Sequence, residues 1–199
     1  MEKIFKIGDK EYVDYSQSGE GKFLFEYVQN MDIEKLFVDI GALDGVTNSN
    51  SKIFMDNGWQ GILFEPNTVT FKKLCGYHKD TQNVELIMKG VSNVNGTVKF
   101  NENRGIAGHS KITKIGKHEI ETVKLKSVVG NKKIGILDID AEGHDNIILK
   151  DIIDDGLRPE IIMIESNDKV SEKEVHEILE PYYDFVTKIS VNTIWRIKH

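Results

Sequence analysis

Short apolar runs alternate along this chain with longer stretches of helical character, and this order constrains the fold more than any other feature of the sequence. Residues 36–40 and 61–65 are expected strands, and each is followed by a helical stretch, at residues 48–57 and 68–78. A helix between two strands supplies the crossover connection that parallel strands require. The order therefore predicts an α/β fold in which a mostly parallel sheet is covered by helices.

The rest of the chain continues this alternation, with two departures. The further elements expected are strands at 84–91, 134–139 and 160–165, helices at 144–154 and 171–179, and strands at 184–189 and 193–198. Residues 93–126 have no helical period and are expected to form a hairpin and a long loop near the acceptor site. Only Ser190-Val-Asn separates the last two strands, and a connection that short joins antiparallel neighbours.

Length, charge and cysteine content restrict the classes to which the chain can belong. The 199 residues, 39% of them apolar, suffice for one sizeable core, and no linker divides them, so residues 1–199 are expected to be one domain with a leading segment at 1–30. A net charge of −6 argues against a nucleic-acid partner. No apolar run exceeds four residues, which predicts no membrane span. Cys75 is the only cysteine, and the first residues include no long apolar stretch of the kind found in secretory signals. The two features together predict a cytoplasmic protein.

Residues 37–45, Phe-Val-Asp-Ile-Gly-Ala-Leu-Asp-Gly, place an acid at a strand end and a glycine-spaced turn after it. Gly41 and Gly45 let the backbone bend sharply and let a ligand approach, and their spacing differs from the dinucleotide fingerprint. A phosphate here would face Asp39 and Asp44, and like charges about 4 Å apart repel by about 4 kcal/mol at an effective dielectric of 20. The turn therefore favours S-adenosyl-L-methionine, whose net charge is positive.

Glu65 ends the second strand, where it can accept hydrogen bonds from both ribose hydroxyls of such a cofactor. Taken alone, Glu65 is better interpreted as a strand-end carboxylate exposed to solvent. The combination with the acidic turn favours the cofactor interpretation.

Three segments at 39–51, 58–67 and 137–145 resemble the FkbM-type class I S-adenosylmethionine-dependent methyltransferases, and residues 15–20, Tyr-Ser-Gln-Ser-Gly-Glu, are similar to a segment that precedes the first of them in that family. The resemblance implies a Rossmann-like class I methyltransferase fold, with a mostly parallel seven-stranded sheet, a C-terminal antiparallel hairpin and helices on both faces. It also implies that the turn holds the methionine half of the cofactor, Glu65 the ribose, and Ser92 with Asn93 the adenine. The cofactor-binding residues expected are Asp39, Gly41, Ala42, Asp44, Gly45, Asn48, Glu65, Pro66, Asn67, Ser92, Asn93 and Asp140.

A second acidic group, Asp138, Asp140 and Glu142, recurs at a spacing of two and precedes Gly143 and His144. In a strand that continued to residue 142, the three carboxylates would share one face. Burial of unpaired charge is costly, so Asp140 and Glu142 are expected beyond the sheet edge, beside the cofactor turn. In the alternative, Asp140 caps the following helix and Glu142 lies in its first turn.

The function expected is methyl transfer by direct displacement, for which the protein aligns the acceptor and excludes water. The resemblance favours oxygen methylation of a small molecule or sugar. A hydroxyl acceptor needs a base, and the catalytic candidates are Asp140, Glu142 and His144. A cation held by Asp140, Glu165 and Asn167 is another route to activation, although no spacing requires a metal.

Two other functions remain open at this point. One is a non-catalytic cofactor-binding or scaffold module of the same fold. The other is a nicotinamide-dependent oxidoreductase, against which Asp44 and the glycine spacing argue. The sequence predicts neither the identity of the acceptor nor the oligomeric state.

Overall fold

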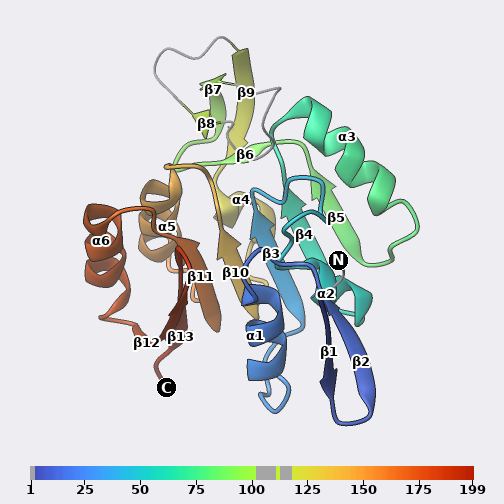
Figure 1. Cartoon of the computed structure of the whole chain (residues 1–199). Helices are drawn as coiled ribbons and strands as arrows, with labels where there is room; N and C mark the ends of the chain where they lie inside the picture. The colour runs from blue at the N-terminus through green and yellow to red at the C-terminus, as the bar shows by residue number, and fades with distance from the viewer. Residues whose placement is uncertain (1–2, 102–110, 113–117) are drawn as a thin grey trace.

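The computed structural model describes residues 3–101, 111–112 and 118–199, and a seven-stranded sheet lies at its centre. Along the sheet the strand order is β12-β13-β11-β10-β3-β4-β5 (Figure 1). The strands are β3 (Leu36–Ile40), β4 (Gln60–Phe64), β5 (Val84–Ile87), β10 (Ile136–Ile139), β11 (Ile161–Glu165), β12 (Tyr183–Ile189) and β13 (Asn192–Ile197). All neighbours pair parallel except β13, which is antiparallel to both β11 and β12. The expected mostly parallel sheet with a C-terminal antiparallel hairpin is confirmed.

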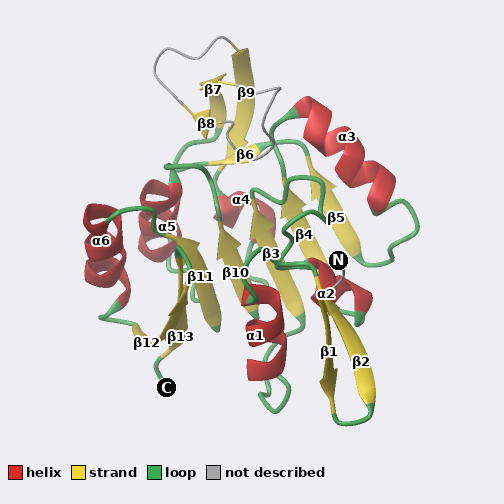
Figure 2. Ribbon diagram, in the orientation of Figure 1, coloured by secondary structure: helices red, strands yellow, loops and turns green. Residues whose placement is uncertain are grey.

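Helices cover both faces of this sheet, as its apolar strands require (Figure 2). The helices are α1 (Glu20–Tyr27), α2 (Lys52–Asp56), α3 (Thr68–Tyr77), α4 (Leu125–Val129), α5 (Asp145–Asp154) and α6 (Lys169–Leu179). Side chains alternate along each strand, so Val38 packs with α4, α5 and α6 in one core, whereas Phe37 packs with α1, α2 and α3 in the other. No helix in the described part of the chain is long and apolar enough to cross a bilayer.

A smaller sheet stands beyond the carboxyl ends of the central strands (Figure 1). Its order is β6-β9-β7-β8, with bounds β6 (Gly90–Val91), β7 (Gly96–Asn101), β8 (Lys111–Ile112) and β9 (His118–Val123). The single strand expected at 84–91 is therefore wrong, because its two halves join different sheets. The hairpin expected within 93–126 is present as the antiparallel β7 and β9, whereas residues 102–110 and 113–117 of the expected loop lie outside the described residues.

Other elements also differ from expectation, including α1 and α4, where no helix was expected. The antiparallel N-terminal hairpin of β1 (Lys3–Ile7) and β2 (Lys10–Asp14) was not expected from the sequence. The helix expected at 48–57 is only α2, because the residues before it are held in a loop: Asn48 has a left-handed φ of 56°, and Ser51 donates its hydroxyl hydrogen bond to Asp39. Residues 48–50 form part of a pocket wall instead of a helical turn.

Candidate active site

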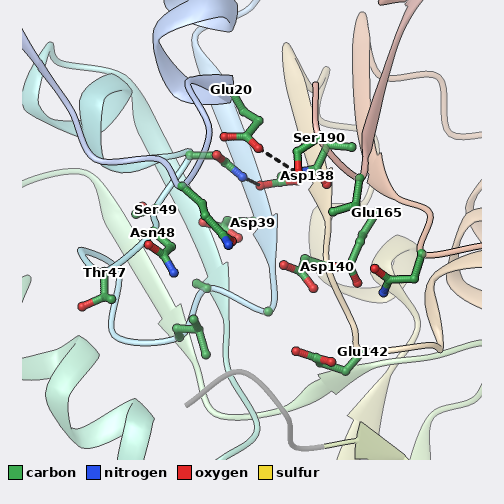
Figure 3. A pocket seen from close by; sticks show the side chains of 18 residues that line it. Glu20, Asp39, Thr47, Asn48, Ser49, Asp138, Asp140, Glu142, Glu165 and Ser190 are labelled. Carbon is green, nitrogen blue, oxygen red and sulfur yellow. Dashed lines mark hydrogen bonds between the residues drawn. The ribbon is translucent and has the colours of Figure 1, made fainter. Parts of the chain in front are cut away.

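A pocket of about 420 Å³ opens at the carboxyl ends of β3 and β10 (Figure 3). The chain leaves β3 toward β4 on one side and leaves β10 toward β11 on the other, so the pocket lies where the strand order reverses. Ligands of open α/β sheets bind in this crevice. The residues that line it are Gln17, Glu20, Asp39, Gly41, Ala42, Leu43, Thr47, Asn48, Ser49, Asn50, Asp138, Asp140, Glu142, Glu165, Asn167, Ser190, Val191 and Asn192.

The turn after β3 passes through spaces that only glycine can occupy. Gly41 has φ +95°, and a Cβ there would lie 1.9 Å from the carbonyl oxygen of Asp140. Gly45 has φ +74°, and a Cβ there would lie 2.5 Å from Nε2 of His78. The backbone N–H groups of Gly41 and Ala42 both donate to the carbonyl of Phe64, at 3.0 Å each. The turn is thus held tightly between the ends of β10 and β4.

Two buried carboxyl groups lie side by side beneath the turn, because Asp39 of β3 is paired with Asp138 of β10. Asp39 accepts a hydrogen bond of 2.5 Å from the Ser51 hydroxyl, and Asp138 accepts one of 2.9 Å from Nδ2 of Asn50. Burial raises the pKa of Asp39 to about 6. Burial and the neighbouring Asp39 raise the pKa of Asp138 as well. This floor of the pocket suits a cation or a group that donates hydrogen bonds.

Asp44 has a local role instead. Its carboxylate accepts hydrogen bonds from the N–H groups of Val46 and Thr47 and from the Thr47 hydroxyl. Neither Asp44 nor Gly45 is among the described residues that line the pocket. Both therefore contribute to the shape of the turn and not to the pocket surface.

Glu65 is 4% exposed, so the alternative of a solvent-exposed strand-end carboxylate is wrong. It accepts a 2.6 Å hydrogen bond from the N–H of Asn67 and another from the backbone of Leu43, which ties the end of β4 to the turn. Burial, which outweighs these hydrogen bonds, raises its pKa to about 7, and the nearby Asp39 contributes. Asn67 follows Pro66 and caps α3 by accepting from Val69 and Thr70.

At the rim of the pocket, Asp140 follows the last residue of β10 and its side chain opens toward the pocket (Figure 3). Oxygen atoms of Asp140, Asp145 and Glu165 lie within 4.8 Å of one another. Asp140 is exposed at the rim, but partial desolvation by the surrounding protein, together with the Glu165 and Asp145 carboxylates, raises its pKa to about 8. The Asp145 carboxylate holds the loop after β10, since it accepts hydrogen bonds from the N–H groups of Ala141 and Gly143 at 2.6 and 2.8 Å.

The structure brings two of the three catalytic candidates into the pocket. Asp140 and Glu142 line it together with Asp138, although β10 ends at Ile139 and Glu142 has a left-handed φ of 52°. The helix α5 begins only at Asp145, so neither Asp140 nor Glu142 is the cap or first-turn residue of the alternative. His144 lies apart from the described lining, with Nε2 3.1 Å from the hydroxyl of Ser92, which in turn donates to Asn93.

Sequence reasoning missed the wall formed by the C-terminal hairpin. Ser190, Val191 and Asn192 line the pocket, and Nδ2 of Asn192 donates a 3.2 Å hydrogen bond to Oε1 of Glu20 in α1. No local pattern signals a contact between residues so distant in the chain.

Comparison with known proteins agrees with this geometry. The sequence model described as "Methyltransferase FkbM domain" matches residues 39–187, whereas no curated protein matches the chain. A solved structure of the Methanococcus jannaschii fibrillarin pre-rRNA processing protein is 18% identical, with a TM-score of 0.54 over 98% of this chain and 82% of that one. Aeropyrum pernix fibrillarin with natively bound S-adenosyl-L-methionine is 10% identical, with a TM-score of 0.54 over 99% and 82%. Podospora anserina methyltransferase PaMTH1, bound to S-adenosylhomocysteine (SAH), is 14% identical, with a TM-score of 0.54 over 90% and 78%.

At these identities the likeness to the solved structures is one of fold. It confirms the Rossmann-like class I methyltransferase fold expected from the sequence.

The Gly41→Ala substitution should damage both stability and cofactor binding, because the new Cβ would overlap the Asp140 carbonyl at a left-handed φ. We expect a loss of about 1–3 kcal/mol in the free energy of unfolding and at least a tenfold weaker affinity for SAH. Denaturant unfolding and calorimetric titration measure the two effects. Gly76 is the matched control: it is helical and has open space around it, so Gly76→Ala should be neutral or stabilising. Equal behaviour of the two variants would contradict the assignment of Gly41.

The affinity for SAH should rise with pH through the pKa of Glu65. In the ribose contact expected from the sequence, a protonated Glu65 offers one acceptor fewer, so binding would have to displace a proton held with a pKa of about 7. Between pH 6 and pH 8 the affinity should increase by about tenfold. The Glu65→Gln variant, which cannot titrate there, should bind more weakly at pH 8 and lose most of this dependence. An unchanged pH profile in that variant would refute the contact.

The same proton should stabilise the protein without cofactor. The pKa of Glu65 is raised in the folded state, so its contribution is fully present below about pH 4.5 and is lost as the pH rises through about 7. The loss is on the order of 3 kcal/mol. Thermal melts without ligand should therefore show a lower Tm at pH 8 than at pH 5.5. The difference should be smaller in Glu65→Gln, and an equal difference would contradict the role of Glu65.

Proposed function

Because the chain belongs to the FkbM methyltransferase family, we propose that this S-adenosylmethionine-dependent methyltransferase transfers the methyl group to a hydroxyl oxygen of a small molecule or sugar. The observation that carries this proposal is the position of Asp140. Its carboxyl group faces the pocket beside the cofactor turn, and its surroundings raise its pKa. With a pKa of about 8, Asp140 accepts a proton more readily than an ordinary carboxylate does, and the fraction of it that is ionised and able to act as the base increases as the pH rises toward 8.

The residues that line the pocket fit the cofactor, together with Glu65, Ser92 and Asn93, which lie outside the described lining. The turn at 41–45, whose glycines leave no room for side chains, would hold the methionine half together with Asn48. Asp39 and Asp138 offer buried acceptors to an ammonium group, and Glu65 offers carboxylate oxygens to the ribose. Ser92 and Asn93 remain the residues proposed for the adenine, with His144 holding the Ser92 hydroxyl in place.

When bound, the cofactor supplies an electrophilic methyl group on a sulfonium. The acidic surface of the pocket stabilises that positive charge, and the sheet edge holds the acceptor in line with the methyl group. Asp140 accepts the hydroxyl proton as the oxygen attacks. Glu165 is a second carboxylate beside Asp140, and its negative charge raises the pKa of Asp140, which favours uptake of this proton.

Asp140→Asn separates a base from a structural residue. It preserves shape and removes the charge, so SAH should bind within a few-fold of the parent affinity while turnover falls by two to four orders of magnitude. The measurement is SAH release with the hydroxyl compound, taken from a panel of sugars and alcohols, that the parent methylates best. Asp154→Asn is the matched control, because Asp154 lies on the exposed surface of α5 and pairs only with Lys150 among the described contacts.

A parental rate in Asp140→Asn would mean that the base is elsewhere or unnecessary. A parent that binds SAH but methylates only nitrogen or carbon would refute oxygen methylation itself.

A further inference from the structure

We propose that the methyl acceptor carries a protonated amine, which binds at an acidic rim formed by Asp140, Glu142 and Glu165. The inference rests on the proposed function, because it assigns the acceptor of that same pocket. It narrows the substrate class to amine-bearing hydroxyl compounds, such as amino sugars or amino alcohols.

The first observation is the charge of the pocket (Figure 3). Six of its lining residues carry carboxyl groups: Glu20, Asp39, Asp138, Asp140, Glu142 and Glu165. Of the lining residues that the structure describes, none is lysine, arginine or histidine. A phosphorylated or carboxylated acceptor would enter this field against repulsion, whereas a cation would be attracted.

The carboxyl groups fall into two sets with different partners. In the deep set, Glu20, Asp39 and Asp138 each accept a hydrogen bond from a neighbouring asparagine or serine side chain. Asp39 and Asp138 of this set lie beneath the cofactor turn and suit the ammonium group of the cofactor, whereas Glu20 contacts the C-terminal hairpin. The rim set lies farther out, at the ends of β10 and β11, where the acceptor has to approach.

The second observation is an unpaired oxygen in the rim set. Oε2 of Glu165 is buried from solvent and meets no hydrogen-bond donor among the described residues. Asn167 and Asp140 do contact the Glu165 side chain, yet this oxygen is left without a partner. A buried carboxylate oxygen without a donor is costly, and a ligand N–H would satisfy it. An ammonium group supplies three such donors and the compensating charge.

A charged amine at the rim also explains why oxygen would be the atom methylated. The carboxylates keep the amine protonated, so it has no lone pair with which to attack. During transfer the oxygen–carbon bond forms, the carbon–sulfur bond breaks, and the hydroxyl proton passes to Asp140. The ammonium group keeps its protons throughout, and the sulfonium becomes a neutral thioether.

The test uses probes that are expected to reach the rim and whose design does not require the identity of the acceptor. These are three analogues of SAH in which nitrogen replaces sulfur and carries a short arm that ends in an amine, a hydroxyl or a carboxylate. The amine arm should bind at least tenfold more tightly than the hydroxyl arm, and the carboxylate arm should be the weakest. A carboxylate arm that equals or exceeds the amine arm would overturn the proposal.

Variants assign this preference to the rim. Glu165→Gln should reduce the ratio of amine-arm to hydroxyl-arm affinity at least fivefold, whereas Glu177→Gln, on the exposed face of α6 beside Lys173, should leave it unchanged. Glu142→Gln, in the half-buried bend after β10, provides the same test if Glu165→Gln does not fold. A ratio that persists in both rim variants would refute the assignment.

Two further measurements separate the remaining outcomes. Magnesium or manganese is titrated with each probe, and a divalent cation that is required for turnover, or that makes the carboxylate arm bind most tightly, would show a metal at the rim and overturn the amine. SAH itself is the reference. If SAH does not bind, the proposed function fails, whereas SAH binding without an amine preference refutes the acceptor class alone.

Discussion

The close approach of β3 and β10 at Gly41 is the constraint on which the site depends. The Asp140 carbonyl occupies the space where any side chain at position 41 would lie, so the turn and the end of β10 are fixed against each other. The same pairing sets Asp39 opposite Asp138, and the Phe64 carbonyl anchors the turn to β4. The positions of the acidic groups therefore follow from backbone geometry, and the floor of the pocket is as rigid as the sheet.

That rigidity has an electrostatic cost, which the pKa values report. Asp39, Asp138 and Glu65 are buried, and each has a pKa above its ordinary value because burial disfavours the charged form. Without ligand, bound protons neutralise these carboxyl groups and remove the cost of burying their charge. A cationic ligand lowers the same cost in a different way, because its positive charge takes the place of those protons. Stability and ligand affinity thus draw on the same groups and respond to pH in opposite directions.

The parts of this arrangement that the sequence predicted are those with a local signal. Strand and helix periodicity predicted the central sheet and most helices, and the glycine-spaced turn with Glu65 predicted the position of the pocket. The sequence did not indicate that Asp44 turns back onto Thr47, that His144 pairs with Ser92, or that α2 begins only at Lys52. These depend on which hydrogen-bond partner is nearest in three dimensions, and residue type and spacing do not encode that choice.

The hydrogen bond between Glu20 and Asn192 has a consequence for biosynthesis. The two residues come from opposite ends of the chain, and between them they close one wall of the pocket. A ribosome-bound chain could already have assembled β3, β4 and the glycine turn, yet it would lack that wall until β13 had emerged. This pocket is therefore complete only once β13 has joined the sheet.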